Sequence, residues 1–243
     1  KPYFDLMYET VQSILAKSGH INHKYLKESE SDKKAVIVVT ANRGLAGGYN
    51  SNITRMIIDE GFTKENTVVY AVGKKGRELL ERKGYEIKAD YSEAINDPIY
   101  KDAKEICDDV LSAFADGEVG EIYLAYTVFK NTVVHEPQLI RLLPVEADDA
   151  AHETDGSEAL MTYEPSEEEA LDMIIPKYVC SLVYGALIES VASENGARMQ
   201  AMDSATSNAE EMISTLSLKY NRARQASITQ ELTEIIAGAN AIE

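Results

Sequence analysis

The sequence predicts an α/β fold in which a mixed β-sheet domain is joined to a long antiparallel coiled coil. Short β-branched runs alternate with amphipathic helical segments between residues 35 and 145, a pattern typical of parallel strands covered by helices. From Lys177 to Ala237 the chain has no proline and only two glycines. That stretch is long enough for a single helix of about 90 Å at 1.5 Å per residue, several times the usual helix length.

Three parts follow from this organisation. Residues 1–18 are expected to be the remnant of an N-terminal helix, residues 33–160 an α/β globular domain, and residues 166–243 a long C-terminal helix. The first residue is a lysine rather than a methionine, so we expect the sequence to be the inside of a longer protein.

The elements of the globular domain can be placed one by one. Expected strands are Ala35–Thr40, Thr67–Val72 and Tyr85–Ala89, and expected helices are Asn50–Asp59, Lys74–Arg82 and Ile99–Phe114. Two further strands, Glu121–Phe129 and Val134–Val145, are separated by a turn so short that they should pair antiparallel. The domain is therefore predicted to be a Rossmann-like mixed sheet.

The C-terminal helix should need a partner. Its middle has a narrow apolar seam at steps of three and four residues, formed by Met199, Met202, Ala205, Ala209, Met212 and Leu216. A helix so long and polar is not stable alone, and Phe4–Lys17 is amphipathic at helical spacing. We therefore expect both ends of the chain to form the antiparallel coiled coil.

The start of the long helix has conflicting signals. Ser166 and Glu169 have the spacing of a capping box. Pro176 would break an interior helix, so we expect either a kink there or a helix that starts just before it. The acidic residues between Glu146 and Asp172 are expected to form a solvated loop that leads into the helix.

Composition excludes several classes of function. The formal net charge of −17 argues against nucleic acid as a partner and against direct docking on anionic lipid. We find neither a secretory leader nor an apolar stretch near the ~18 residues that a membrane span requires.

No metal centre is predicted. Cys107 and Cys180 lie far apart in the sequence and have no C-x-x-C or Cys/His spacing, so we expect buried or half-buried free thiols. His20 and His23 are three residues apart, but they lie in an expected loop with no third ligand nearby.

The stretch "AVIVVTANRGLAGGYNSNI" raises the question of nucleotide binding, because a glycine-rich turn between a strand and a helix is a common phosphate site. Both specific signatures fail. Gly48 is followed by Tyr49-Asn50 instead of Lys-Ser/Thr, and the pattern is G-x-x-G-G instead of G-x-G-x-x-G. We expect the glycines to let a tight turn pack close to the next helix, with Asn50 or Ser51 as its N-cap, and no cofactor.

No catalytic constellation is found either. The sequence has no Ser/His/Asp arrangement, no H-E-x-x-H and no G-x-S-x-G. Two classes remain open from the residues: a nucleotide-binding α/β regulator with a helical dimerisation arm, and a coiled-coil scaffold. The seam thins to small and polar residues over 205–208, whereas a scaffold should keep Leu or Ile throughout.

Several segments carry a family pattern. "ANRGLAGGYNSNI" resembles the glycine turn of the γ subunit of F-type ATP synthases, and "ASENGARMQAMDSATSNAEEMI" and "YNRARQASITQELTEIIAGANAI" are similar to its C-terminal helix. "YEPSEEEALDMIIPKYV" fits the segment that starts this helix. The resemblance covers essentially the whole chain, but the first part of the family's N-terminal helix is absent. The cysteine-pair insertion of chloroplast members is also missing, which indicates a bacterial source.

The resemblance implies a non-catalytic rotor shaft, the central stalk. The terminal helices would turn inside the hexamer of three α and three β subunits, and the globular domain would bind the ε subunit and the ring of c subunits. Rotation driven by proton or sodium flow would couple to ATP synthesis or hydrolysis. The protein would be peripheral, at the cytoplasmic face of the bacterial plasma membrane, with contact to the membrane only through the c-ring.

The same resemblance suggests partner-contact residues. Arg198, Gln225, Thr229 and Glu231 match motif positions that face the β subunits in the family. From the residues alone, solvated side chains explain them as well.

Overall fold

The computed structural model describes residues 23–26, 31–145 and 167–240. The chain has two compact units, one up to Arg198 and a second from Met199. The expected helix over Phe4–Lys17, the expected cap at Ser166 and nearly all of the acidic loop lie outside the described residues.

The first unit is built on a five-stranded mixed sheet with the order β3-β2-β1-β4-β5. Its strands are β1 (Lys34–Val39), β2 (Thr67–Val72), β3 (Glu86–Asp90), β4 (Glu121–Phe129) and β5 (His135–Leu143). Strands β1 to β4 are all parallel to one another, and β5 pairs antiparallel with β4. The mixed sheet and the antiparallel final pair are as the sequence predicted.

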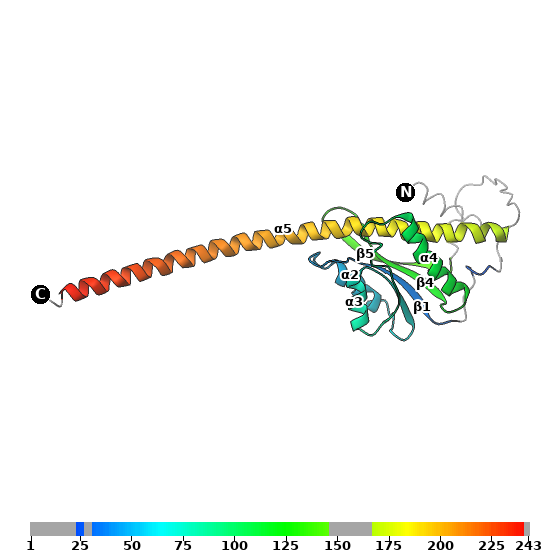
Figure 1. Ribbon diagram of the computed structural model, residues 1–243, viewed down its shortest axis with the longest axis horizontal. Coiled ribbons are helices and arrows are strands. Elements are labelled where there is room, and N and C mark those ends of the chain that lie inside the picture. The colour runs from blue at the N-terminus through cyan, green and yellow to red at the C-terminus, as the bar shows by residue number, and fades with distance from the viewer. Residues whose placement is uncertain (1–22, 27–30, 146–166, 241–243) are drawn as a thin grey trace, which may run out of the picture. The chain divides into compact units, whose positions relative to one another are not determined.

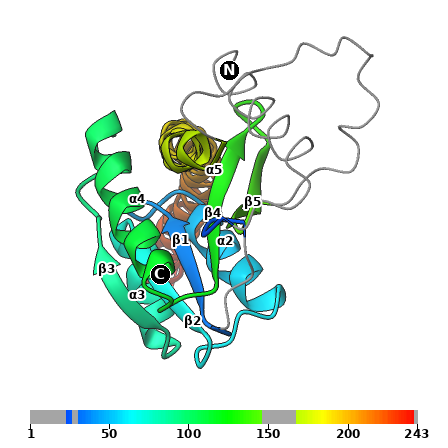
Figure 2. The ribbon, with the colours of Figure 1, turned by 90° about the vertical axis from the view of Figure 1, so that its right-hand side faces the viewer.

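Helices cover both faces of this sheet (Figures 1 and 2). They are α2 (Tyr49–Asp59), α3 (Lys74–Arg82), α4 (Tyr100–Ala115) and α5 (Glu167–Asn240). Side chains of α4 and of the first part of α5 pack on one face, among them Ile106, Leu171 and Val183. Side chains of α2 and α3 pack on the other face, among them Ile57 and Leu80. The strands in the middle are apolar on both faces, as buried parallel strands must be.

Helix α5 begins at Glu167, next to the start at residue 166 that the sequence indicates, and runs through Pro176. The alternative, a start just before the proline, is wrong. Proline removes one helical hydrogen bond, but Leu171, Ile175 and Val179 are buried on both sides of it. This packing against the sheet holds the helix together across the missing bond.

The same helix contains an 18-residue window with a mean hydropathy of 1.5, which by length and composition alone would suit a membrane span. The expectation that no apolar stretch approaches this length is therefore wrong. Of that window 44% is buried inside the protein, as expected for a helix that packs on a sheet. The window is therefore weak evidence for a span.

A short N-terminal segment is tied to α5. His23 is buried and its Nε2 lies 3.2 Å from Asp172 Oδ1, while Lys24 forms a 2.8 Å ion pair with the same carboxylate. The hydrogen bond from Lys24 is the main reason that the pKa of Asp172 is lowered. His23 therefore serves as an anchor of the segment.

Candidate functional site

The glycine loop lies at the carboxyl edge of the sheet, between β1 and α2, where open α/β sheets usually bind ligands. Here Leu45 and Gly47 have positive φ angles of 63° and 55°. Space is open around Gly44 and Gly47, so close packing against the helix is not the reason for these glycines. The prediction of an Asn50 or Ser51 N-cap is also wrong, because the cap is Gly48 and α2 begins at Tyr49.

The Asn50 side chain binds the loop backbone instead of capping the helix. Its side-chain oxygen accepts a 2.8 Å hydrogen bond from the Ala41 N–H, and its amide donates to the Arg43 carbonyl. The side chain therefore holds the beginning of the loop in shape. A helix-capping residue and a loop-bracing residue have the same amino-acid preferences, which explains the error.

The neighbouring helix N-terminus, that of α3, has already used its donors. The N–H groups of Lys74, Lys75 and Gly76 donate to the Asn42 side chain, the Ala41 carbonyl and the Thr40 hydroxyl, at 2.9, 3.0 and 2.9 Å. A helix N-terminus binds phosphate through such free donors. Since these three are satisfied by the loop after β1, the α3 N-terminus does not have them free for a phosphate.

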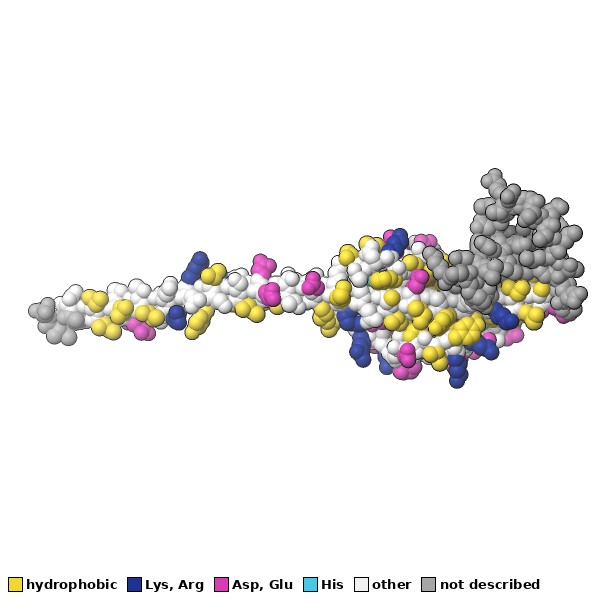
Figure 3. All heavy atoms as spheres, turned by 90° about the horizontal axis from the view of Figure 1, so that it is seen from above, with side chains coloured by type: hydrophobic (Ala, Val, Ile, Leu, Met, Phe, Trp, Pro, Cys, Tyr) yellow, Lys and Arg dark blue, Asp and Glu magenta, His cyan; other side chains and the backbone are white. Residues whose placement is uncertain are grey.

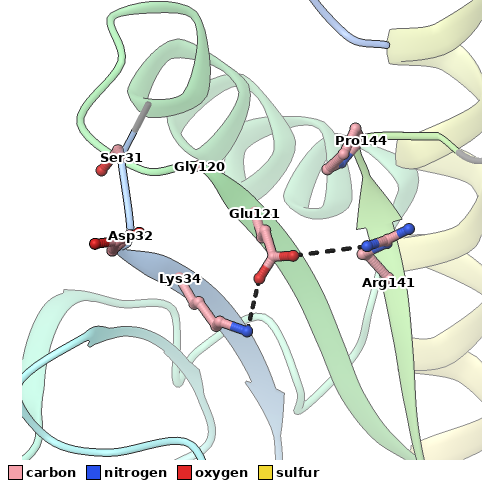
Figure 4. A pocket seen from close by; sticks show the side chains of 7 residues that line it. All are labelled: Ser31, Asp32, Lys34, Gly120, Glu121, Arg141 and Pro144. Carbon is pink, nitrogen blue, oxygen red and sulfur yellow. Dashed lines mark ion pairs between the residues drawn. The ribbon is translucent and has the colours of Figure 1, made fainter. Parts of the chain in front are cut away.

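A polar pocket opens at the amino ends of strands β1 and β4, opposite the end that carries the glycine loop (Figure 4). Lys34 of β1, Glu121 of β4 and Arg141 of β5 point toward one another there, with ion-pair distances of 2.7 Å for Lys34 and 3.6 Å for Arg141. Burial raises the pKa of Glu121, but the hydrogen bonds from Lys34 and Tyr123 and the charges of Lys34 and Arg141 together outweigh it, and the net shift is downward. Each cation is engaged by this carboxylate, so the group links three strands.

The two cysteines, far apart in sequence, meet in the fold. Cys107 on α4 and Cys180 on α5 are buried free thiols joined by a side-chain hydrogen bond. That bond, together with a weaker one from Tyr100, lowers the pKa of Cys180 to about 7. The same bond and burial raise the pKa of Cys107.

This difference predicts the order of alkylation. Iodoacetamide should modify Cys180 before Cys107, and both at least about tenfold more slowly in the native protein than in urea, because only an opened, ionised thiol reacts. Peptide mass spectrometry over a time course measures both rates. Equal labelling of the two thiols, or earlier labelling of Cys107, would contradict the assignment.

The second unit consists of the α5 residues from Met199 onward. The described side chains between Met202 and Gly238 are all exposed, although many are large and apolar (Figure 3). Examples are Met212 and Ile213, each 64% exposed, Leu216 at 56% and Ile235 at 68%. Large apolar side chains that recur at helical spacing and stay exposed are typical of a surface that a protein partner covers.

The four predicted contact residues do not form one cluster. Gln225, Thr229 and Glu231 lie on the exposed helix of the second unit. Arg198 is the last residue of the first unit, and its guanidinium forms a 2.5 Å ion pair with Glu194 one turn earlier. In the described part of the chain, no group of three or more His, Cys, Asp or Glu side chains could hold a metal ion.

Sequence reasoning missed a junction between α5 and the sheet. Ser190 and Ser193 are completely buried on α5 and bind the backbone of Thr127 on β4 at 3.5 and 3.2 Å. The hydroxyl of Tyr49 donates to the Ser190 carbonyl at 3.1 Å. Two serines three residues apart on one helix were the only signal, and such a pattern is common on solvated helices.

Residues 1–242 match the ATP synthase family. The ATP synthase gamma chain of Lachnoclostridium phytofermentans is 66% identical over the whole of this chain and 85% of its own length. The gamma chain of Alkaliphilus metalliredigens is 42% identical, and so is the "sodium ion specific" gamma chain of Acetobacterium woodii, with the same coverage.

Solved structures share the fold. A chain of the Euglena gracilis mitochondrial ATP synthase aligns with a TM-score of 0.65 at 18% identity, covering 99% of this chain and 90% of its own. A chain of the central stalk and c-ring structure of the Tetrahymena thermophila enzyme aligns with a TM-score of 0.59 at 24% identity, covering 81% of this chain and 86% of its own. From the family match and the identities, the chain belongs to the ATP synthase gamma chain family.

Proposed function

We propose that this chain is the rotor shaft of an F-type ATP synthase. Rotation of the shaft couples ion flow through the membrane c-ring to ATP synthesis and hydrolysis on the hexamer of three α and three β subunits. The observation that carries the proposal is the exposed apolar helix after Met199, in a chain that is 66% identical to a gamma chain.

The exposed helix calls for surrounding protein. Helices in proteins gain most of their stability from packing of an apolar face, and here that face is exposed over residues 202–238. We propose that an N-terminal helix over residues 1–18 and the α and β subunits cover it. The globular domain, residues 33–160, would bind the ε subunit and the c-ring, in keeping with the stalk and c-ring structure that shares its fold.

The physical demands of rotation fit such a chain. One charge that crosses 100 mV supplies about 2.3 kcal/mol, so several translocations must be accumulated mechanically for each ATP. The long helix has no proline after Pro176 and can carry this load. The shaft acts by rigid-body displacement of its neighbours and needs no catalytic group.

We further propose the cytoplasmic face of the bacterial plasma membrane as its location. The protein would be peripheral and would reach the membrane through the c-ring. The bacterial relatives support this placement.

Native mass spectrometry of the full-length subunit, isolated from membranes washed with low-salt EDTA, tests the proposal. We expect an assembly with three α and three β subunits and ATPase activity. A free monomer or homodimer that binds ATP or NAD would contradict it and favour the regulator with a dimerisation arm. A bridging assembly that never rotates would favour the scaffold.

Replacement of Arg198 and Gln225 by alanine tests the proposed partner contacts, which include Thr229 and Glu231. In the isolated chain we expect little loss of stability, at most about 1 kcal/mol for the half-buried Arg198–Glu194 ion pair. In the complex we expect weaker coupling or assembly, measured as ATP synthesis by membrane vesicles. Unchanged ATP synthesis would count against a role for these two residues, and the exposed Lys219→Ala provides a charge-removal comparison on the same helix.

A further inference from the structure

The contact between α5 and the sheet changes character along the helix. In its first turns α5 contributes apolar side chains to the core, such as Leu171, Ile175 and Val183, each 0% exposed. Apolar burial is non-directional, so it holds a helix against a sheet without fixing its angle about its own axis. Toward the end of the first unit the buried residues of α5 are Ser190 and Ser193, which bind by directional hydrogen bonds.

These serines complete the backbone pairing of β4. Parallel pairing of β1 with β4 ends at Ala125, so the strand on that side no longer supplies partners for the Thr127 backbone groups. Ser190 Oγ accepts from the Thr127 N–H, and Ser193 Oγ donates to the Thr127 carbonyl. Helix α5 thus takes the place of a neighbouring strand at one residue, in a position where buried backbone groups need partners.

A third element closes the arrangement. Tyr49, the first residue of α2, is 5% exposed and donates to the main-chain carbonyl of Ser190. Burial raises the pKa of Tyr49, so the phenol stays protonated and remains a donor. One helix, α5, is therefore held from two sides, by β4 and by α2.

The next turn of α5 is fitted to the strand hairpin. A Cβ atom at Gly196 would lie 2.6 Å from His135 Cε1 of β5, so the absence of a side chain lets the imidazole sit against the helix. Ala197 packs on Ala41, Ala46 and Tyr49 of the glycine loop region. Shape and hydrogen bonding together leave α5 one rotational setting on this domain.

We propose that Tyr49, Thr127, Ser190 and Ser193 form a torque clamp, which fixes the rotational angle of α5 on the sheet domain and passes torque between the domain and the shaft. This inference rests on the proposed rotor function. The four residues are positioning residues, and no catalytic role is assigned to them.

The test uses the chain assembled with α and β subunits. The hexamer is immobilised, a bead is attached to the sheet domain, and torsional stiffness is read from the thermal angular fluctuations of the bead. Ser190→Ala/Ser193→Ala removes the side-chain bonds to Thr127 without adding atoms. We expect the angular variance to rise at least about twofold, because two of the three directional hydrogen bonds are lost. In the complete enzyme in membrane vesicles, ATP-driven ion pumping should fall relative to ATP hydrolysis.

Leu187→Ala is the matched control. Leu187 is buried on the same helix, and its truncation lowers the thermal unfolding midpoint without removing a clamp hydrogen bond. Tyr49→Phe, which removes one hydroxyl and keeps the ring, gives a second and milder clamp variant in case the double serine variant fails to assemble. This variant should also raise the angular variance of the bead, by less than the double serine variant does.

The outcomes separate the clamp from the rotor function. Wider fluctuations in the clamp variants, with unchanged fluctuations in Leu187→Ala, support the clamp. Equal fluctuations in all variants overturn it and leave the rotor function intact, provided the wild-type chain rotates. If the wild-type chain does not rotate relative to the immobilised hexamer, the proposed rotor function is contradicted and the clamp proposal with it.

Discussion

Gly73→Ala is expected to be the most damaging single substitution in the sheet domain. Gly73 is the N-cap of α3 and has a φ angle of 116°. A Cβ atom there would lie 2.1 Å from the Thr40 carbonyl oxygen, a backbone atom that cannot move without breaking the β1–α3 connection. Strain and overpacking together should cost at least about 3 kcal/mol of unfolding free energy.

Gly117→Ala is the comparison that isolates the clash. Gly117 also has a positive φ angle, 74°, but nothing lies within 4 Å of its added Cβ. Its cost should be limited to the backbone conformation, about 1–2 kcal/mol. Urea denaturation of the three proteins, followed by circular dichroism, measures both values. Similar losses for the two variants would show that the contact with Thr40 is not decisive.

Met212→Asp/Leu216→Asp is expected to prevent assembly while leaving the isolated chain folded. Both side chains are exposed in the isolated chain, 64% and 56%, so their replacement removes no described core contact. In the complex each would be buried, and loss of that burial costs about 1.5–3 kcal/mol per side chain. Association should therefore weaken at least about 100-fold, since 1.4 kcal/mol is a factor of ten.

Ser214→Asp serves as the control for that experiment. Ser214 is exposed on the same helix but lies away from the Met212–Leu216 seam, given the 100° turn per residue of an α-helix. It adds a carboxylate without removing apolar surface. Quantification of the gamma chain that co-purifies with tagged α and β subunits compares the variants. Equal co-purification of both would contradict a buried seam.

The arrangement of strands and helices was predictable because period and length identify such elements. Strands β2 and β4 and helix α3 begin and end at the predicted residues. Each is an apolar run or an amphipathic segment bounded by turn residues, which is a local signal. The unbroken course of α5 through Pro176 was not predictable in this way, since a local rule about proline was overridden by packing on both sides of it.

Side-chain roles depended on non-local contacts. Asn50 has the composition of a helix cap, yet it braces Ala41 and Arg43 across the loop. Cys107 and Cys180 gave no spacing signal, and only the packing of α4 beside α5 brings their thiols together. The need for glycine at position 73 likewise comes from Thr40, a residue on another element.

The sequence by itself determined the α/β class, the order of elements, the length of α5 and, through its motifs, the gamma chain family. These depend on residue patterns that repeat along the chain. Only the tertiary structure decided that the donors at the α3 N-terminus are already used, and that α5 completes the pairing of β4 through Ser190 and Ser193. Hydrogen-bond satisfaction is a property of groups brought together in space, and no spacing along the chain records it.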